Sequence, residues 1–209
     1  MSEAKSAEPR PYHHGDLRRA LIDAARRLLE AEGPSALSLR AVAREAGVSP
    51  AAPYHHFKDK SELLDAVAHE GWETLGAQMA EAKSGAEGRA QLTALGIAYV
   101  CFARDNPALY RVMYDAVRDK EALPEDIHDK DDSAYCMVRD TLIEQGADPA
   151  AEAHLELATI AAWCAGHGLA EMAGFTQFAP LKEALGGERR FLEAVFEHMG
   201  LFQHPPGAC

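Results

Sequence analysis

Tyr54, His55, His56 and Lys60 stand close together in the stretch GVSPAAPYHHFKDKSELL. Phenol and imidazole groups can donate hydrogen bonds, and a lysine in the first turn of a helix, beside N–H groups without partners, forms a site for an anion. Phosphate is the natural anion for such a site, and donors beside it can reach base edges in a DNA groove. These residue types indicate binding chemistry rather than the making or breaking of bonds.

Motifs for catalysis and for metal binding are missing from the sequence. It contains no nucleophile elbow, phosphate loop or HExxH motif. Its four cysteines are scattered without CxxC spacing, so neither a zinc site nor a disulfide framework is indicated. We therefore expect a protein that is not an enzyme and that has no cofactor and no metal site.

Two prolines, Pro50 and Pro53, interrupt the stretch that carries these donors. With Ser49 as N-cap of a short helix, Pro50 takes the first helical position, where its missing N–H is no loss. Pro53 is then the fourth helical residue, so most of the usual cost of about 3 kcal/mol is avoided and its ring can pack inward. The pattern predicts a short, stiff helix over 50–57. Its predicted outward surface consists of Ala51, Ala52, Tyr54 and His55, with His56 alongside.

Two helices are predicted before this element. DLRRALIDAARRLLEAEG has an apolar face at helical spacing and ends at Gly33 and Pro34. LRAVAREA follows Ser38 as N-cap and ends at Gly47, which tolerates the positive φ of a tight turn. Two helices joined by such a turn form a helix-turn-helix motif.

The remainder of the chain also shows helical spacing. Strict alternation of apolar and polar residues does not persist anywhere, so the fold class is predicted to be all-α. A capping box is predicted where Asp59 and Glu62 open the first of these later helices. The later predicted helices span 60–82, 88–104, 107–118, 124–145, 149–173 and 181–200.

The formal net charge of −12 is unevenly distributed. Residues 1–60 contain ten Lys or Arg and eight Asp or Glu, a balance of +2, whereas residues 61–209 contain eleven and twenty-five, a balance of −14. This asymmetry permits contact with DNA at one end of the chain and discourages it elsewhere. No apolar run approaches the roughly 18 residues of a membrane helix, so we expect a cytoplasmic protein without a membrane partner.

The run from Leu17 to Leu64 resembles the DNA-binding domain of the TetR family of bacterial transcription regulators. The family pattern has a small residue in the second helix, a Gly-Val turn, a recognition helix that ends in Tyr-x-His-Phe, and a lysine at the start of the fourth helix. This sequence departs from it at Pro53, where many members carry Leu, Ile or Val. The matching residues are Ala43, Gly47, Val48, Tyr54, His56, Phe57 and Lys60.

The resemblance implies a homodimer that reads a pseudo-palindromic double-stranded DNA operator. It implies a flexible arm at 1–14, in which Arg10 is a candidate for the minor groove, a DNA-binding domain at 15–60 and a helical domain at 61–209. Ser38 and Ser49 would also serve as caps in any helical protein, Phe57 suits the core, and His56 suits either a buried hydrogen bond or a DNA contact. The implied phosphate contacts are Ser38, Tyr54 and Lys60; the base or groove contacts are Pro50, Ala51, Ala52 and His55; and Ser49 and His56 are further candidates.

The family's helical domain binds a small effector and dimerises through its last two long helices, here predicted at 149–173 and 181–200. Small residues along PAAEAHLELATIAAWCAGHGLAEMAGF would allow close approach of another helix. The spacing of Trp163, His167 and Gly168 resembles the WHG signature of one subgroup, although a core tryptophan beside a hydrogen-bonded histidine is the simpler explanation. A mainly apolar effector pocket is expected, with an unidentified ligand. Its expected lining is Tyr99, Phe102, Tyr110, Met113, Tyr114, Trp163 and His167.

Together these features predict a transcriptional regulator, most simply a dimeric repressor that a small-molecule effector releases from its operator. The alternative is a thiol-responsive or metal-responsive sensor that uses Cys101, Cys136 or Cys164. That alternative requires the side chains to converge, and helical spacing alone gives it no support.

Overall fold

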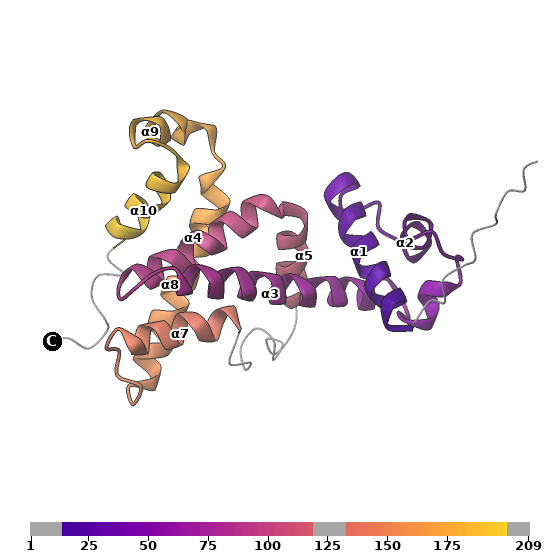
Figure 1. Cartoon of the computed structure of the whole chain (residues 1–209), viewed down its shortest axis with the longest axis horizontal. Helices are drawn as coiled ribbons and strands as arrows, with labels where there is room; N and C mark the ends of the chain where they lie inside the picture. The colour runs from indigo at the N-terminus through magenta and orange to yellow at the C-terminus, as the bar shows by residue number, and fades with distance from the viewer. Residues whose placement is uncertain (1–13, 119–132, 200–209) are drawn as a thin grey trace, which may run out of the picture. The chain divides into compact units, whose positions relative to one another are not determined.

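The computed structural model describes residues 14–118 and 133–199, and every regular element in these ranges is a helix (Figure 1). The predicted all-α class is confirmed. The chain divides into two compact units, with the boundary between Val67 and Ala68. No helix within the described ranges combines the length and the apolar character that crossing a bilayer requires. The predicted arm at 1–14, with Arg10, lies almost wholly outside the described residues.

The first unit begins with the two predicted helices, α1 (His14–Glu32) and α2 (Leu39–Glu45). Helix α1 ends at Gly33, whose φ of +79° is the left-handed conformation that favours glycine, and the Gly33 N–H donates to the Leu29 carbonyl over 2.9 Å. Helix α2 begins after Ser38, whose hydroxyl oxygen accepts a hydrogen bond from the Ala41 N–H at 3.1 Å. The cap predicted at Ser38 is therefore confirmed.

The turn after α2 also forms as predicted, but the next element is shorter and tighter. Gly47 has a φ of +69°, and the Val48 N–H closes the turn on the Ala43 carbonyl at 2.9 Å. Instead of a helix over 50–57 capped by Ser49, the structure has one 3₁₀ turn, η1 (Ala52–His55). Ala51 occupies its N-cap position, without a side-chain cap. The predicted Ser49 cap is therefore wrong.

The two prolines explain this correction. An α-helical bond to the Ser49 carbonyl would have to come from residue 53, and Pro53 has no N–H to donate. The Ser49 carbonyl accepts instead from the Ala52 N–H at 3.0 Å, and the Ala51 carbonyl accepts from the Tyr54 N–H at 3.2 Å. Both bonds span three residues, which is the 3₁₀ pattern. Pro53 is buried, as its predicted inward position requires.

Helix α3 (Lys60–Ser84) crosses the boundary between the two units in the sequence. Asp59 Oδ1 accepts a hydrogen bond from the Glu62 N–H at 3.0 Å, which is the first half of the predicted capping box. The Glu62 carboxylate does not return to the Asp59 N–H but accepts from the Lys58 N–H at 2.7 Å. The cap therefore holds the residue before the N-cap as well as the helix start.

The second unit contains α4 (Ala90–Asp105), α5 (Pro107–Arg118), α7 (Ala134–Glu144) and α8 (Glu152–Ala173). Helix α8 packs against α4 and α7, while α10 packs against α4 (Figure 1). The predicted helices at 88–104, 107–118 and 149–173 are confirmed to within three residues at their ends. Of the helix predicted at 124–145, residues 124–132 lie outside the described part of the chain.

The predicted helix at 181–200 is wrong as a single element. The structure has a 3₁₀ turn, η2 (Thr176–Phe178), and two helices, α9 (Ala179–Ala184) and α10 (Glu188–His198). Gly186 and Gly187 separate α9 from α10 with φ values of +87° and +120°, which no α-helix accommodates.

The core of the second unit uses glycines to bring helices close together. A Cβ on Gly96 of α4 would lie 2.5 Å from the ring of Phe196, which is fully buried on α10. A Cβ on Gly166 of α8 would lie 3.4 Å from the ring of Tyr99 on α4. Gly166 is buried and faces Tyr99 within the chain, so it is not available for the contact between chains predicted for this stretch.

We predict that Gly96→Ala lowers the free energy of unfolding by about 1–3 kcal/mol, because the methyl group overlaps a ring that is packed on all sides. Urea denaturation at a fixed protein concentration measures the change. Gly85→Ala is the matched control, since its Cβ would meet only ordinary contacts at 3.7 Å and beyond. Equal stability of the two variants would contradict the placement of Phe196 against Gly96.

Candidate functional site

Most side chains predicted for DNA contact lie on the surface of the first unit. Pro50, Ala51 and His55 are exposed, Ala52 is half-buried, and Tyr54 is 54% exposed. The turn η1 thus presents short side chains at its start and a phenol and an imidazole at its end. Such a surface can approach a groove closely and donate hydrogen bonds.

Ser38 and Ser49 are both exposed. The Ser38 hydroxyl oxygen is used as an acceptor by the α2 cap, which leaves its O–H free to donate. A hydroxyl that caps a helix and donates outward stands beside the partly unpaired N–H groups of that helix start.

Lys60 is exposed at the first position of α3, and its ammonium has a partner that the sequence did not reveal. Its Nζ donates to the Pro34 carbonyl at 2.9 Å, in the turn that follows α1. An ammonium has three N–H donors, so two remain for an anion. The contact holds the charge beside the first turn of α3.

His56 and Phe57 face inward. Phe57 is 1% exposed and belongs to the core, as the core interpretation predicted. His56 is half-buried, and its Nε2 is enclosed without a hydrogen-bond partner in the described structure. The buried hydrogen bond considered for His56 does not form at that nitrogen. Sequence reasoning also missed Arg18 of α1, whose guanidinium lies 5.4 Å from the centre of the Phe57 ring, because no periodicity links residues so far apart.

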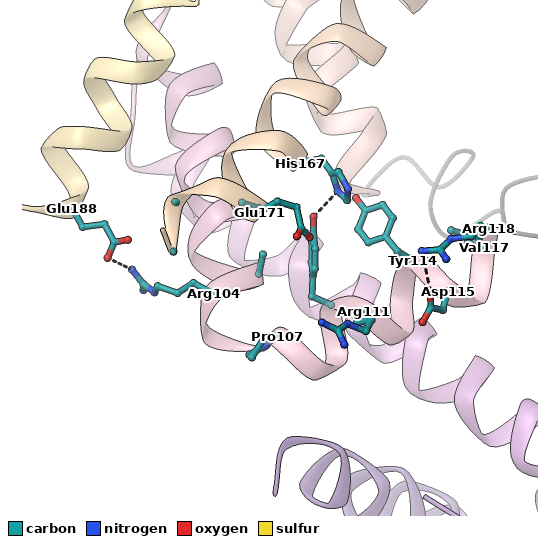
Figure 2. Close-up of a pocket in the computed structure, with 15 residues that line it drawn as sticks. Arg104, Pro107, Arg111, Tyr114, Asp115, Val117, Arg118, His167, Glu171 and Glu188 are labelled. Carbon is teal, nitrogen blue, oxygen red and sulfur yellow. Dashed lines mark hydrogen bonds and ion pairs between the residues drawn. The ribbon is translucent and has the colours of Figure 1, made fainter. Parts of the chain in front are cut away.

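An open pocket of about 760 Å³ lies in the second unit, between α4, α5, α8 and the start of α10. Figure 2 shows Arg111, Tyr114, Asp115 and Arg118 on α5, with His167 and Glu171 on α8. Two ion pairs lie in its wall: Arg104 with Glu188 at 2.9 Å, and Arg118 with Asp115 at 3.1 Å. Its lining is Ala103, Arg104, Pro107, Tyr110, Arg111, Tyr114, Asp115, Val117, Arg118, His167, Ala170, Glu171, Ala173, Gly174 and Glu188.

A network of hydroxyls and one imidazole forms the inner side of this pocket. The Tyr99 hydroxyl hydrogen-bonds the Tyr114 hydroxyl, lies 2.9 Å from the Tyr110 hydroxyl and lies 3.3 Å from His167 Nδ1. The Tyr110 hydroxyl is 2.5 Å from His167 Nδ1. Trp163 packs edge-on against Tyr99, with ring centres 5.3 Å apart. The network joins α4, α5 and α8.

Burial sets the protonation of the three phenols. It raises the pKa of Tyr99 far above the usual range, and the neighbouring Tyr114 and Tyr110 act in the same direction. Burial also raises the pKa of Tyr110, while the hydrogen bond with Tyr99 lowers it. The pKa of Tyr114 is raised to about 12 by burial, against hydrogen bonds with Tyr99, Trp163 and Tyr110 that lower it. All three phenols are therefore protonated donors at neutral pH.

The seven residues predicted to line one effector pocket do not all line the same cavity. Tyr110, Tyr114 and His167 line the open pocket. Tyr99 and Trp163 line a second cavity of only about 20 Å³, room for about one water molecule. The fully buried Phe102 and Met113 do not line the open pocket.

The open pocket is also more charged than the mainly apolar pocket that was predicted. Sequence reasoning missed Arg104, Arg111, Asp115, Arg118, Glu171 and Glu188. A usable signal existed on α5, because Arg111, Asp115 and Arg118 follow at helical spacing beside Tyr110 and Tyr114. A prediction based on apolar spacing alone selects residues on the core side of the same helices.

The cysteines give the sensor alternative no support. Cys101, Cys136 and Cys164 lie on three different helices. Burial raises the pKa of Cys101, which reduces its reactive thiolate form. No group of three or more His, Cys, Asp or Glu suited to hold a metal occurs among the described residues.

Comparison with known families assigns both units. Residues 21–67 match the model described as "Bacterial regulatory proteins, tetR family", and residues 92–199 match "Tetracyclin repressor-like, C-terminal domain". The chain is 30% identical over 132 residues to the uncharacterized HTH-type transcriptional regulator YobS of Bacillus subtilis (strain 168), a match that covers 63% of this chain and 66% of YobS. It is 46% identical over 50 residues to the HTH-type transcriptional regulator BetI of Rhizobium meliloti (strain 1021), covering 24% of this chain and 25% of BetI. The chain thus matches just under two thirds of YobS and a quarter of BetI.

Solved structures agree with this assignment. A protein of unknown function from Rhodococcus sp. RHA1 is 31% identical, with a TM-score of 0.71 over 93% of this chain and 98% of that chain. A TetR family transcription regulator from Marinobacter aquaeolei VT8 is 20% identical, with a TM-score of 0.62 over 90% of this chain and 94% of that chain. The second likeness is one of fold alone.

Removing the central hydroxyl of the network tests its contribution to stability. We predict that Tyr99→Phe lowers the free energy of unfolding by about 1–3 kcal/mol, because its buried partners lose a hydrogen bond without gaining water. Urea denaturation measures the effect, with Tyr54→Phe as control, since the exposed Tyr54 hydroxyl has no hydrogen-bond partner in the described structure. A Tyr99→Phe variant as stable as the parent chain would contradict the network.

Proposed function

The chain belongs to the TetR family of bacterial regulatory proteins, and we propose that it is a dimeric DNA-binding repressor that a small-molecule effector releases from its operator. In this proposal residues 15–60 bind DNA, and residues 61–209 bind the effector and dimerise. The regulator works where the bacterial chromosome lies, in the cytoplasm. Its activity is binding, without a catalytic step.

The observation that best supports DNA binding is the exposed surface formed by η1 and the starts of α2 and α3. We assign phosphate contacts to Ser38, Tyr54 and Lys60, which have donors available at that surface. The balance of +2 over residues 1–60, against −14 over the rest, favours this end of the chain for a polyanion.

Base and groove contacts fall on the short side chains of the turn. We assign them to Pro50, Ala51, Ala52 and His55, with the exposed Ser49 at the rim. Methyl groups can contact a thymine methyl, and an imidazole can hydrogen-bond a base edge. The inward placement of His56 suits support of the turn rather than a DNA contact.

The dimer is supported by an apolar stripe on the outer side of α8. Leu157 is 65% exposed, Ile160 is 43% exposed and Cys164 is exposed, one helical turn apart in succession. Met172 on α8, Leu181 on α9 and Leu185 at the C-cap of α9 are also exposed. A two-fold dimer buries such a stripe against its own copy. We therefore propose that the interface lies in the predicted region 149–173 and at α9 within the predicted region 181–200.

Effector release requires the pocket to influence α3, the helix that crosses the unit boundary. Gly71 of α3 lies against Met113 of α5, with a Cβ-to-Sδ distance of 2.6 Å if a side chain were added. Trp72 of α3 packs edge-on against Tyr114 of α5, with ring centres 5.4 Å apart. A ligand that favours one position of α5 therefore favours one position of α3. When α3 moves, the spacing of the two η1 turns in a dimer, which we call the recognition turns, changes as well.

Selection of bound DNA from a random pool tests the function directly. The expected product is a site with two related half-sites in opposite orientation, because a two-fold dimer presents two identical recognition turns. Recovery of no enriched sequence would contradict the proposal. A single half-site would contradict the dimeric mode of reading.

The recovered site then allows the phosphate contacts to be tested. We predict that the double variant Tyr54→Phe, Lys60→Ala weakens DNA binding about equally for different sequences and makes the salt dependence shallower by about one unit. Fluorescence anisotropy at several salt concentrations measures both. The control is Lys83→Ala, whose ammonium pairs with Glu144 in the second unit at 2.9 Å. Unchanged salt-dependent binding in the double variant would show the phosphate assignment to be wrong.

The dimer interface has a separate test. We predict that Ile160→Glu converts the dimer to a monomer, because it places an unpaired carboxylate in a buried apolar contact. Sedimentation velocity at matched concentrations measures the assembly state. Ala77→Glu, on an exposed position of α3, adds the same charge outside the stripe and should leave the dimer intact. A dimeric Ile160→Glu variant would place the interface elsewhere.

A further inference from the structure

Most polar side chains in the wall of the open pocket already have partners. Arg104 pairs with Glu188, Arg118 pairs with Asp115, and the Tyr110 and Tyr114 hydroxyls belong to the buried network. Within residues 14–118 and 133–199, Arg111 and Glu171 of the lining form no ion pair, and the outer nitrogen of His167 has no hydrogen-bond partner.

Two phenol hydroxyls lie beside Nδ1 of His167. The Tyr110 hydroxyl is 2.5 Å from Nδ1 and the Tyr99 hydroxyl is 3.3 Å from it, and both phenols are protonated at neutral pH. We assign Nδ1 as the acceptor for these O–H groups, and in the neutral form of the imidazole the proton then lies on Nε2.

The Nε2–H of His167 is available to the pocket. The side-chain nitrogens that are enclosed without a partner among the described residues belong to His56 and Trp72, so His167 Nε2 is not enclosed. His167 is half-buried and lines the pocket, and its Nδ1 lies within hydrogen-bond distance of the Tyr110 hydroxyl. The opposite edge therefore offers a hydrogen-bond donor to a ligand.

The two remaining charges are opposite and come from different helices. Glu171 follows His167 by one turn on α8, and its charge contributes to the raised pKa of Tyr110 after burial. Arg111 follows Tyr110 on α5. No ion pair joins Arg111 to Glu171 among the described residues, and both side chains line the pocket (Figure 2). The pocket therefore presents an unpaired cation, an unpaired anion and the Nε2–H donor assigned to His167.

We propose that the open pocket binds a small zwitterion, a molecule with one ammonium and one carboxylate, as in an amino acid. The carboxylate binds the Arg111 guanidinium and the His167 Nε2–H, while the ammonium binds the Glu171 carboxylate. This inference rests on the proposed function, since it names the chemical class of the effector.

Molecules with one charge fit the pocket less well. A carboxylate alone leaves Glu171 unpaired beside the bound anion, in a part of the chain whose balance is already −14 over residues 61–209. An amine alone leaves Arg111 facing a cation. Only a ligand with both charges satisfies both side chains, so discrimination comes from repulsion as well as attraction.

Three matched series of probes test the ligand class with the full chain in isothermal titration calorimetry. Each series shares one carbon body: 4-aminobutyrate, butyrate and butylamine; 6-aminohexanoate, hexanoate and hexylamine; L-phenylalanine, 3-phenylpropanoate and 2-phenylethylamine. The series differ in the distance between the charges and in the bulk of the body. The expected result is that the zwitterion of at least one series binds about tenfold or more tightly than both singly charged partners. Equal or weaker binding of the zwitterion in all three series, or no binding at all, would overturn the proposal.

Two variants assign the charges. Arg111→Gln should weaken zwitterion binding about ten- to a hundredfold and leave binding of the amine unchanged or stronger. Glu171→Gln should weaken zwitterion binding by a similar factor and leave the carboxylate unchanged or stronger. The controls are Arg139→Gln and Glu81→Gln, which remove the same charges from exposed positions outside the pocket. Equal effects of pocket and control variants would refute the assignment.

The orientation of His167 has its own measurement. Nitrogen NMR of the imidazole should report a protonated Nε2 and an unprotonated Nδ1 in the free chain, and Tyr99→Phe should weaken that preference. A proton on Nδ1 in the parent chain would overturn the donor role of His167.

The same samples separate this inference from the proposed function. If the DNA selected from the random pool binds but no probe does, the ligand class is wrong and DNA binding stands. If a zwitterion binds while no DNA is selected, the pocket assignment stands and the regulatory function fails. If a bound zwitterion leaves the affinity for DNA unchanged, its role as effector is wrong.

Discussion

The buried hydroxyl of Tyr99 is the constraint on which the second unit depends. The Tyr99 ring on α4 lies against Gly166 of α8, and its hydroxyl ends between α4, α5 and α8. A hydroxyl enclosed there without partners would cost about 1–3 kcal/mol. The structure meets this requirement with groups from two other helices, Tyr110 and Tyr114 on α5 and His167 on α8. Because each hydroxyl both donates and accepts, one polar group fixes the rotation of two helices, and the open pocket lies on the outer side of that arrangement.

The contact between α3 and the pocket wall is of a different kind. Trp72 stacks on Trp163, with ring centres 6.2 Å apart, and lies edge-on to Tyr114. Its Nε1 is buried without a hydrogen-bond partner among the described residues, so ring packing and burial of its large surface must offset that cost. Packing of rings is less directional than hydrogen bonding and permits one helix to shift against another. The pocket wall is held by hydrogen bonds, whereas its contact with α3 is apolar. This combination suits a site in which a bound ligand shifts α3, the helix that continues into the other unit.

Helices were predicted correctly where local sequence signals determine the structure. The prediction failed where contacts between residues distant in the sequence determine it. Apolar spacing, the Ser38 cap and Gly47 were sufficient for the first two helices and their turn. In the predicted helix at 181–200, apolar residues at helical spacing occur on both sides of Gly186 and Gly187, so the break between α9 and α10 was not predicted. Leu192 and Phe196 of α10 are buried within the chain, with Phe196 against Gly96 of α4, so they are not available to a second copy. No local pattern reveals which helix receives them. The same limit explains the pocket, because its charged lining comes from α4, α5, α8 and α10.

The recognition turn η1 shows how two prolines in the backbone limit the base contacts that its surface could make. Two prolines three residues apart remove two N–H donors, and the missing bond to the Ser49 carbonyl converts a predicted helix into one 3₁₀ turn. A 3₁₀ turn advances about 2.0 Å per residue, with three residues per turn, so residues three apart share a face. Ala51 and Tyr54 are such a pair, and both are exposed. If this turn enters a major groove, His55 is the side chain of the tip best able to hydrogen-bond a base, and methyl contacts and DNA shape supply the remaining discrimination. The hydrogen bond from the Lys60 ammonium to the Pro34 carbonyl is then as important as the side chains of the turn. A recognition element this short depends on fixed phosphate contacts to set its register on the DNA.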